Sequence, residues 1–541
     1  MRWSSVVSAL ALLWLVALVP GQSPPPANQL SPAKQPRAAP PSLQGPATPA
    51  THPSDPSFMG LDLRKMLEDL PRKQIYDIHS ATEAALQDIL TNVPIEARPY
   101  TRYLALYHMA KQERREHLQT LNFLSNSLSF QAQIKQWRAV PGTNFALIAI
   151  DIRYYGWKAE AWENLVKEDT YFHATLVSSV QRFDAQGKAL AGQKIFSDQP
   201  SINIAHVTDL KIATRSIGPV LLGDWFLSRV CQPPHYYAFA GIGNKEADFQ
   251  ARVDGRPADA EKYQADRAGI VLRSGITVKN RRLTRIPTML GAYWFSTDAA
   301  NGTGAQDYTH VLLERGQENF DASEQIASLP NGLQVYGLFN NKGDRVNTAP
   351  SNIASDGTAA GNLRDVIAGK SCMVCHNTGI LSFRSVFGDL VGPTLDIKST
   401  RLDKLQRLNQ LYDQDLDDLF TADQIRYAKA VRAATKLHAT PGLSAEANAL
   451  QFARIYNGYV EDVVTPTKAA LELGIPADKM VYYLKASGNR AILNLLKPNT
   501  KGVPRYQWEQ AVPEAIDLIA KKRLQPAQEA PVTKVLPNTG K

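Results

Sequence analysis

The sequence contains little cysteine, few long apolar runs and no strong excess of one charge. Its 3 cysteines in 541 residues are too few for a scaffold built from disulfides. The 60 Lys and Arg residues exceed the 51 Asp and Glu residues by a net charge of only +9. No long Lys/Arg block is present, so we predict no nucleic-acid partner. With 44% hydrophobic and 21% charged residues, the composition is typical of a water-soluble globular protein, and the length favours two or more domains.

The longest apolar run lies at the N-terminus. Residues 6–19 follow Arg2, end before Pro20 and are followed by small residues. Such a run is too short to cross a bilayer comfortably and is typical of a secretory signal peptide. We predict a signal peptide over residues 1–22 and export to a periplasmic or secreted location; an uncleaved anchor is the alternative. No other stretch is long enough to span a membrane, so the mature protein is predicted not to be an integral membrane protein.

Composition divides the rest of the chain into four regions. Residues 23–57 are dense in Pro, Ala and Ser, which predicts a disordered linker. Residues 58–350 mix helical and strand patterns and predict an α+β domain of unknown function. Residues 351–524 show mainly helical spacing, and residues 525–541 are typical of a flexible tail. The predicted fold class is multidomain, with an N-terminal α+β domain followed by a mainly α-helical domain.

Apolar spacing also predicts individual elements. In the α+β domain we expect helices at residues 58–128 and 219–231, and strands at residues 145–155, 270–294 and 333–346. In the C-terminal domain we expect helices at residues 421–437, 444–459, 476–484 and 506–521, the first opened by a capping box at residues 421–424.

The motif that carries chemistry stands near the start of the predicted helical domain. Cys372, Cys375 and His376 form a C-x-x-C-H sequence, the attachment signature of c-type haem. Two cysteines at this spacing can both add to vinyl groups along one porphyrin edge, and the adjacent histidine then supplies the proximal bond to the iron. If the 3 cysteines and 10 histidines were placed at random among the 541 positions, the pattern would be expected on the order of 3 × 10⁻⁴ times. We therefore predict one covalently attached haem c, with His376 as the ligand of its iron.

Three other interpretations of the cysteine pair are weaker. A thioredoxin-like pair should follow a strand within a βαβ unit, whereas residues 362–369 have the pattern of a short helix. A zinc site needs two further ligands at close spacing, and none is near in the sequence. A structural disulfide would be strained across only two intervening residues.

Apolar residues around the motif could exclude water from a haem and so raise the potential of its iron. Gly379 would permit a close approach of the backbone there. The expected apolar wall consists of Val374, Ile380, Leu381, Phe383, Val386, Phe387, Leu390 and Val391, although several of these could be ordinary helix-core residues.

The sixth iron ligand is left open by the sequence. Met480 is the only methionine after the motif, but its helical spacing suits a core residue equally well. His438, His310 and Met289 are the other candidates. An open sixth position would allow ligand binding or peroxide chemistry.

Two further groups of residues are expected to be structural. Cys231 could pair with His235, but an isolated cysteine beside an apolar helix is more often buried and inert. Aromatic groups at residues 154–157, 236–237 and 293–295 could line a ligand groove or an electron path, with core packing the favoured role. No catalytic residue is predicted.

The motif and its helical surroundings resemble c-type cytochromes. The wider chain, from about residue 100 onward, resembles an exported, poorly characterised bacterial family of monohaem proteins with a large N-terminal α+β extension. This resemblance implies a cytochrome c-like haem domain and transfers only Cys372, Cys375 and His376. It is carried by residues 102–103, 126–129, 279–283, 291–294, 328–334, 349–350 and 371–376 and by Gly379.

Two functions from different classes follow. The first is electron transfer with a redox partner protein. The second is a haem-dependent oxidoreductase or peroxidase-like enzyme whose α+β domain holds the substrate; a haem-based gas sensor is a third possibility. The single C-x-x-C-H motif argues against the bacterial dihaem peroxidases, which need a second haem. The sequence leaves the oligomeric state, the redox potential and the question of enzymatic activity open.

Overall fold

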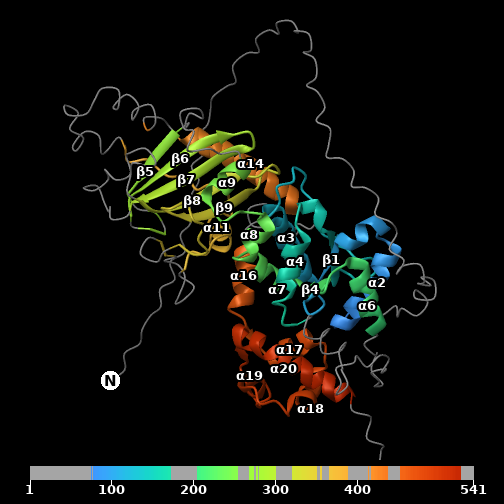
Figure 1. Ribbon diagram of the computed structural model, residues 1–541. Coiled ribbons are helices and arrows are strands. Elements are labelled where there is room, and N and C mark those ends of the chain that lie inside the picture. The colour runs from blue at the N-terminus through green and yellow to red at the C-terminus, as the bar shows by residue number, and fades with distance from the viewer. Residues whose placement is uncertain are drawn as a thin grey trace, which may run out of the picture. The chain divides into compact units, whose positions relative to one another are not determined.

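The computed structural model of the chain describes part of its length in detail (Figure 1). The chain divides into two units, Met1–Leu61 and Asp62–Lys541, and every described residue belongs to the second unit. The predicted signal peptide, linker and tail lie outside the described residues, as do His310 and His438. The described residues are 75, 77–171, 204–253, 267–299 without 273, 275 and 278, 320–349, 354–355, 365–387, 412, 416–435 and 451–524.

A small four-stranded sheet organises the first part of the described chain. Its strands lie in the order β2 (Arg138–Ala139), β3 (Leu147–Asp151), β1 (Thr101–Ala105) and β4 (Val220–Leu222). β1 runs antiparallel to β3 and parallel to β4. Every residue of β1, β3 and β4 is buried, because helices pack against the sheet. The helices that contact the strands include α2 (Ile78–Thr91) and α7 (Gly223–Val230). Their neighbours are α3 (Lys111–Ser127), α4 (Ala159–Val166) and α6 (Ile204–Thr214).

This sheet confirms one sequence prediction and corrects two. The strand expected at residues 145–155 is β3. β1 lies inside the stretch predicted to be helical, residues 58–128, and the helix expected at residues 219–231 begins with β4 before α7 follows. Both missed strands have five residues or fewer. Pairing with neighbouring strands decides the conformation of such short segments, and local spacing cannot reveal it.

A second, five-stranded sheet is antiparallel throughout, with each strand beside the next in the sequence (Figure 1). The strands expected at residues 270–294 and 333–346 belong to this sheet. Its strands are β5 (Arg267–Val271), β6 (Arg281–Thr288), β7 (Gly291–Ala299), β8 (Phe320–Ser328) and β9 (Gln334–Asn340).

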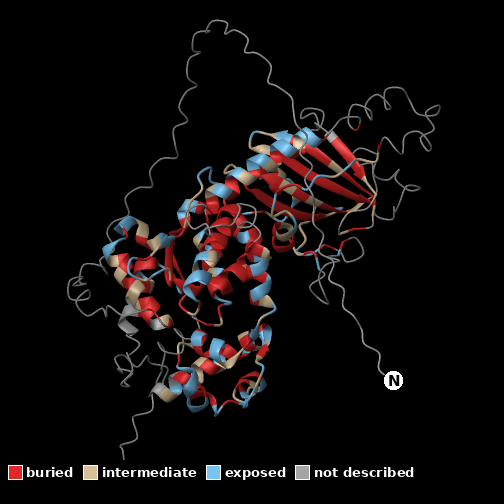
Figure 2. Cartoon of the chain, turned by 180° about the vertical axis from the view of Figure 1, so that it is seen from behind, coloured by how far each residue is buried: buried red, intermediate tan, exposed pale blue. Residues whose placement is uncertain are grey.

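The two faces of this sheet pack against different helices. Because side chains alternate along strands, the paired residues Trp294, Ile326 and Tyr336 share one face. On that face, α14 (Asp417–Thr435) stacks Phe420 on Trp294, with ring centroids 5.2 Å apart. On the other face, α9 (Glu246–Val253) packs its Phe249 against the sheet. Both faces are therefore covered, and Figure 2 shows the strands buried along most of their length.

Short helices dominate the last part of the described chain. They are α16 (Gln451–Val460), α17 (Pro466–Leu473), α18 (Met480–Leu484), α19 (Arg490–Leu495) and α20 (Arg505–Leu524), with a 3₁₀ turn at Ala477–Lys479 before α18. One antiparallel strand pair, β10 (Val463–Val464) and β11 (Val503–Pro504), interrupts them. The described chain is therefore a mixed α and β protein, as predicted. The finer expectations, a cytochrome c-like domain and the predicted domain boundaries, stay predictions.

Two local predictions near the motif are wrong. α14 begins at Asp417, so the box at residues 421–424 lies inside the helix rather than at its start. The described residues 365–369, expected to end a short helix, instead carry a β-bridge between Thr348 and Ile367. Within the described ranges, no helix has both the length and the apolar character needed to cross a membrane.

Candidate functional site

The C-x-x-C-H motif lies on a short helix, α11 (Lys370–Cys375). The residue before it, Gly369, has a φ of +76°. A Cβ atom there would lie 2.5 Å from the ring of Tyr236 and 2.6 Å from the carbonyl oxygen of Cys231. Only glycine suits both the backbone angle and this space. The start of α11 is therefore packed directly against Tyr236, which lies in α8 (His235–Ala240).

The three motif residues lie on this helix or directly after it. Cys375 follows Cys372 by three positions on α11, which places the two on the same helical face, and His376 is the residue that caps the helix. Neither cysteine forms a disulfide; Cys372 is half-buried against the core and Cys375 is exposed. Burial raises the pKa of the Cys372 thiol to about 12, so this cysteine is a neutral thiol at pH 7. The fully buried Met373 fixes the helix to the protein core.

His376 is held in a defined tautomer. Its Nδ1 lies 3.2 Å from the carbonyl oxygen of Gly379, so Nδ1–H donates this hydrogen bond and Nε2 keeps its lone pair. Burial lowers the pKa of His376, which favours the neutral imidazole. Gly379 has a φ of +101°, and a Cβ there would lie 3.2 Å from the ring of Tyr427. The backbone at Gly379 therefore lies close to Tyr427, while a close approach to a haem stays a prediction.

These residues fit the attachment chemistry of haem c. Two cysteine thiols one helical turn apart can reach one porphyrin edge, and a neutral imidazole with an unprotonated Nε2 is the form that binds iron. Among the described residues, no group of three or more His, Cys, Asp or Glu side chains could hold a bare metal ion.

The expected apolar wall divides into three sets. Ile380 and Phe387 are buried, and Val374, Phe383 and Val386 are half-buried. Ile380 and Phe383 pack with Trp294 and Phe420 on the five-stranded sheet. Leu381 is exposed, and Leu390 and Val391 lie outside the described residues. The water-excluding role of this wall stays a prediction.

The candidates for the sixth ligand occupy different environments. Met480 is 2% exposed and begins α18, which packs against α20, so it is a core residue of the C-terminal helices. Met289 is 92% exposed at the turn between β6 and β7. His310 and His438 lie outside the described residues.

The residues expected to be structural are so. Cys231 is fully buried, its Sγ contacts the carbonyl oxygen of Ser228, and burial raises the pKa of its thiol. His235 contacts Glu168 instead of Cys231. In the predicted aromatic groups, every residue is buried except Tyr154 and Gly156, which are exposed. This confirms a packing role.

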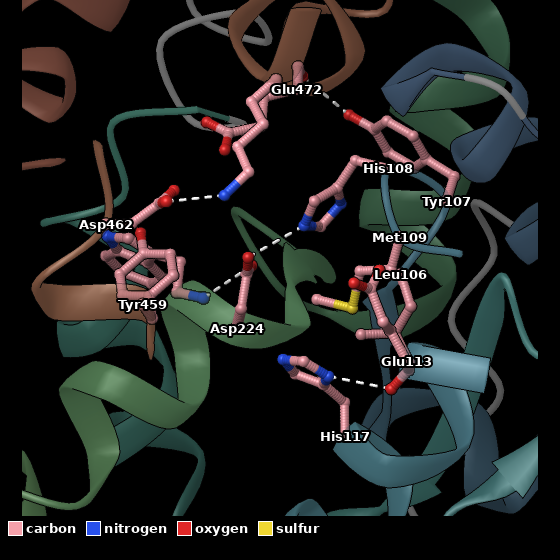
Figure 3. Close-up of polar contacts among 12 residues, drawn as sticks. Leu106, Tyr107, His108, Met109, Glu113, His117, Asp224, Tyr459, Asp462 and Glu472 are labelled. Atoms are coloured by element: carbon pink, nitrogen blue, oxygen red, sulfur yellow. Dashed lines mark hydrogen bonds and ion pairs between the residues drawn. The ribbon is translucent and has the colours of Figure 1, made fainter. Parts of the chain in front are cut away.

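A second polar site was missed by the sequence analysis. His108 follows β1 and Asp224 follows β4, so both stand at the carboxyl ends of two parallel strands. His108 Nε2 lies 2.9 Å from Asp224 Oδ2, and both side chains are at most 10% exposed (Figure 3). His108 Nδ1 is buried with no hydrogen-bond partner among the described residues. A histidine and an aspartate just after two buried strands would have been the signal, but both strands were predicted as helix.

Beside this pair lies a buried network centred on Glu472 of α17. Arg505 donates to both Glu472 oxygens, at 2.8 and 2.9 Å, and to Asp462 at 2.8 Å. Tyr171 and Trp508 also donate to Glu472, at 2.9 and 2.8 Å. The Glu472 carboxylate accepts from one charged donor, Arg505, and from two neutral donors, Tyr171 and Trp508. This network ties the C-terminal helices to the α+β residues and is structural.

The His108–Asp224 pair predicts a pH-dependent stability. Burial alone would lower the pKa of His108, but the charge and hydrogen bond of Asp224 raise it above 6.5. Burial alone would raise the pKa of Asp224, but His108 and Arg505 lower it well below 3.8. The His108 contribution is complete below pH 6.5 and is lost as the pH rises through its raised pKa. The Asp224 contribution is complete above pH 3.8 and is lost in strong acid.

We therefore expect His108→Gln to lower the stability by about 3 kcal/mol at pH 5.5, because a buried carboxylate loses its counter-charge. The deficit should be smaller at pH 8.5, because the wild-type imidazole loses its proton as the pH rises through its raised pKa. Urea unfolding at both pH values measures this. His117→Gln is the comparison, because His117 acts on Asp224 through charge, while its Nδ1 contacts a backbone carbonyl oxygen of its own helix; its deficit should therefore be smaller. An equal deficit for His108→Gln at both pH values would contradict the ion pair.

Comparison with known proteins places the chain in no family: no family model, no curated protein and no solved structure matches it.

Proposed function

We propose that this protein is an exported c-type cytochrome that carries one covalent haem and transfers electrons to or from a redox partner protein. Cys372 and Cys375 would form the two thioether bonds, and His376 would be the proximal ligand of the iron. The observation that carries the proposal is the arrangement of α11, where two cysteines without a disulfide lie one turn apart and the following imidazole holds its proton on Nδ1. The N-terminal sequence supports export, and covalent haem attachment takes place outside the bacterial cytoplasm.

The chain's own groups would prepare this site. Cys372 and Cys375 would hold the haem covalently, each by adding its S–H across one vinyl C=C bond, and such an addition would need no oxidant or reductant. Gly379 holds Nδ1–H of His376, which keeps Nε2 unprotonated and more basic. Half-burial of the histidine beside Tyr336 lowers the local dielectric constant. The bound haem would supply a one-electron iron couple.

A second candidate is a haem-dependent oxidoreductase or peroxidase-like enzyme whose α+β residues hold the substrate. It is favoured by the positions of the two described ligand candidates, Met480 in the C-terminal core and Met289 in solvent. Neither placement supports a sixth bond to an iron held at His376, and an iron with an open position can bind peroxide or a small gas.

One set of spectra separates these functions. The full chain is produced in a host that matures c-type cytochromes, and its reduced-minus-oxidised spectrum is recorded with and without CO. A low-spin reduced haem that does not respond to CO supports electron transfer. A high-spin haem that binds CO supports the enzyme or a gas sensor. Colourless, iron-free protein would overturn both haem proposals.

A further inference from the structure

The imidazole of His376 packs against a buried tyrosine of the five-stranded sheet. The ring of Tyr336, on β9, lies nearly parallel to it, with centroids 6.0 Å apart and an angle of 29° between the planes. Tyr336 is 1% exposed, so its ring has little freedom to move. Together with the Gly379 carbonyl at Nδ1, this ring restricts the rotation of the imidazole.

A second tyrosine holds Tyr336 through its backbone. The hydroxyl of Tyr236 donates to the carbonyl oxygen of Tyr336 at 3.1 Å and accepts from its N–H at 2.8 Å. β9 is the last strand of its sheet, so the outward backbone groups of Tyr336 have no neighbouring strand to pair with. The fully buried hydroxyl of Tyr236 therefore makes the two hydrogen bonds that a neighbouring strand would otherwise make with the backbone of Tyr336.

The same Tyr236 also touches the start of the motif helix. Its ring occupies the space that a side chain at Gly369 would need. Tyr236 thus contacts β9 through its hydroxyl and α11 through its ring. Tyr236 therefore links α11, which ends just before His376, to the strand that carries Tyr336.

We propose that Tyr236 and Tyr336 form a clamp that positions the axial histidine and so sets the reduction potential of the iron. This inference rests on the proposed haem function. Tyr336 acts on the imidazole face, and Tyr236 fixes the relation of Tyr336 to α11. Both are positioning residues, because they act through His376. Imidazole orientation and its surroundings are a lever on haem potential.

The test compares variants that disturb the contacts between Tyr236, Tyr336 and His376 with variants that keep these contacts. Tyr236→Phe removes both hydrogen bonds to Tyr336, and Tyr336→Leu removes the stacked ring. Tyr336→Phe keeps that ring. Tyr237→Phe is the matched control, since it loses one buried hydrogen bond, to the carbonyl oxygen of Val346, on the same helix. Potentiometric titration and low-temperature EPR of the oxidised haem are recorded for all four.

We expect Tyr236→Phe and Tyr336→Leu to shift the midpoint potential and the EPR g-values, while Tyr336→Phe and Tyr237→Phe keep wild-type values. Identical potentials and g-values in all four variants would overturn the clamp. If Tyr236→Phe does not fold, the comparison of Tyr336→Leu with Tyr336→Phe decides alone. A haem stain of the wild type is read first: without a haem band the proposed function has failed, whereas the clamp fails only on haem-loaded protein.

Discussion

The variant Cys372→Ala/Cys375→Ala is expected to show no haem-stained band at the size of the protein on a denaturing gel. Both thioether bonds need a cysteine sulfur, and haem held only by His376 separates when the chain is denatured. The effect is a complete loss rather than a reduction. Cys375 is exposed and Cys372 only half-buried, so the fold loses little packing. Circular dichroism of the variant should therefore match that of the apoprotein.

Cys231→Ala provides the matched control for this experiment. It removes the third cysteine, which is fully buried in the core, directly follows α7 and belongs to no motif. Its haem band should equal that of the wild type. Single variants at Cys372 or Cys375 keep one thioether and should give a weaker band. A full-strength band from the double variant would refute attachment through the motif.

The arrangement of the motif residues could be predicted because it is local, whereas their role in haem attachment stays a prediction. Cys372 and Cys375 lie one turn apart on α11 and His376 follows directly, whatever surrounds them. The proton position on His376 follows from Gly379, three residues away, and the glycine was noticed in the sequence for its backbone freedom. The contact between Tyr236 and Tyr336 could not be predicted, since the two residues are 100 positions apart and meet only at the sheet edge.

The second polar site shows why distant contacts escape a reading of one sequence. His108 and Asp224 are 116 residues apart, and Arg505 meets Tyr171 across 334. Their juxtaposition depends on the parallel pairing of β1 and β4, two short strands with no strand periodicity. The error at residues 421–424 has a related cause: the residues of a capping box also occur inside helices, and α14 starts where Asp417 and Asp418 suit its N-terminal dipole.

Arg505→Met is expected to lower the free energy of unfolding by about 3–5 kcal/mol at pH 7, the second large effect. Arg505 is the only side chain that neutralises Glu472 among its described partners, and Glu472 is 7% exposed. Removing Arg505 leaves the buried Glu472 carboxylate with only neutral donors among its described partners, and leaves Asp462 with its ion pair to Lys468. Burial alone would lower the pKa of Arg505, but the charge of Glu472 raises it, so the guanidinium is charged at every working pH.

The size of this loss depends on burial, and a matched pair of variants tests that dependence. Arg229→Met breaks a similar contact, 2.7 Å from Arg229 Nη2 to Glu509 Oε2, but the Arg229 side chain is 36% exposed and water can replace it. Urea unfolding should therefore show a loss of at most about 1 kcal/mol for Arg229→Met. The double variant Arg505→Met/Glu472→Gln should recover part of the Arg505→Met loss, since it removes the stranded charge. Equal losses for the two arginine variants would mean that the Glu472 network is no stronger than a surface ion pair.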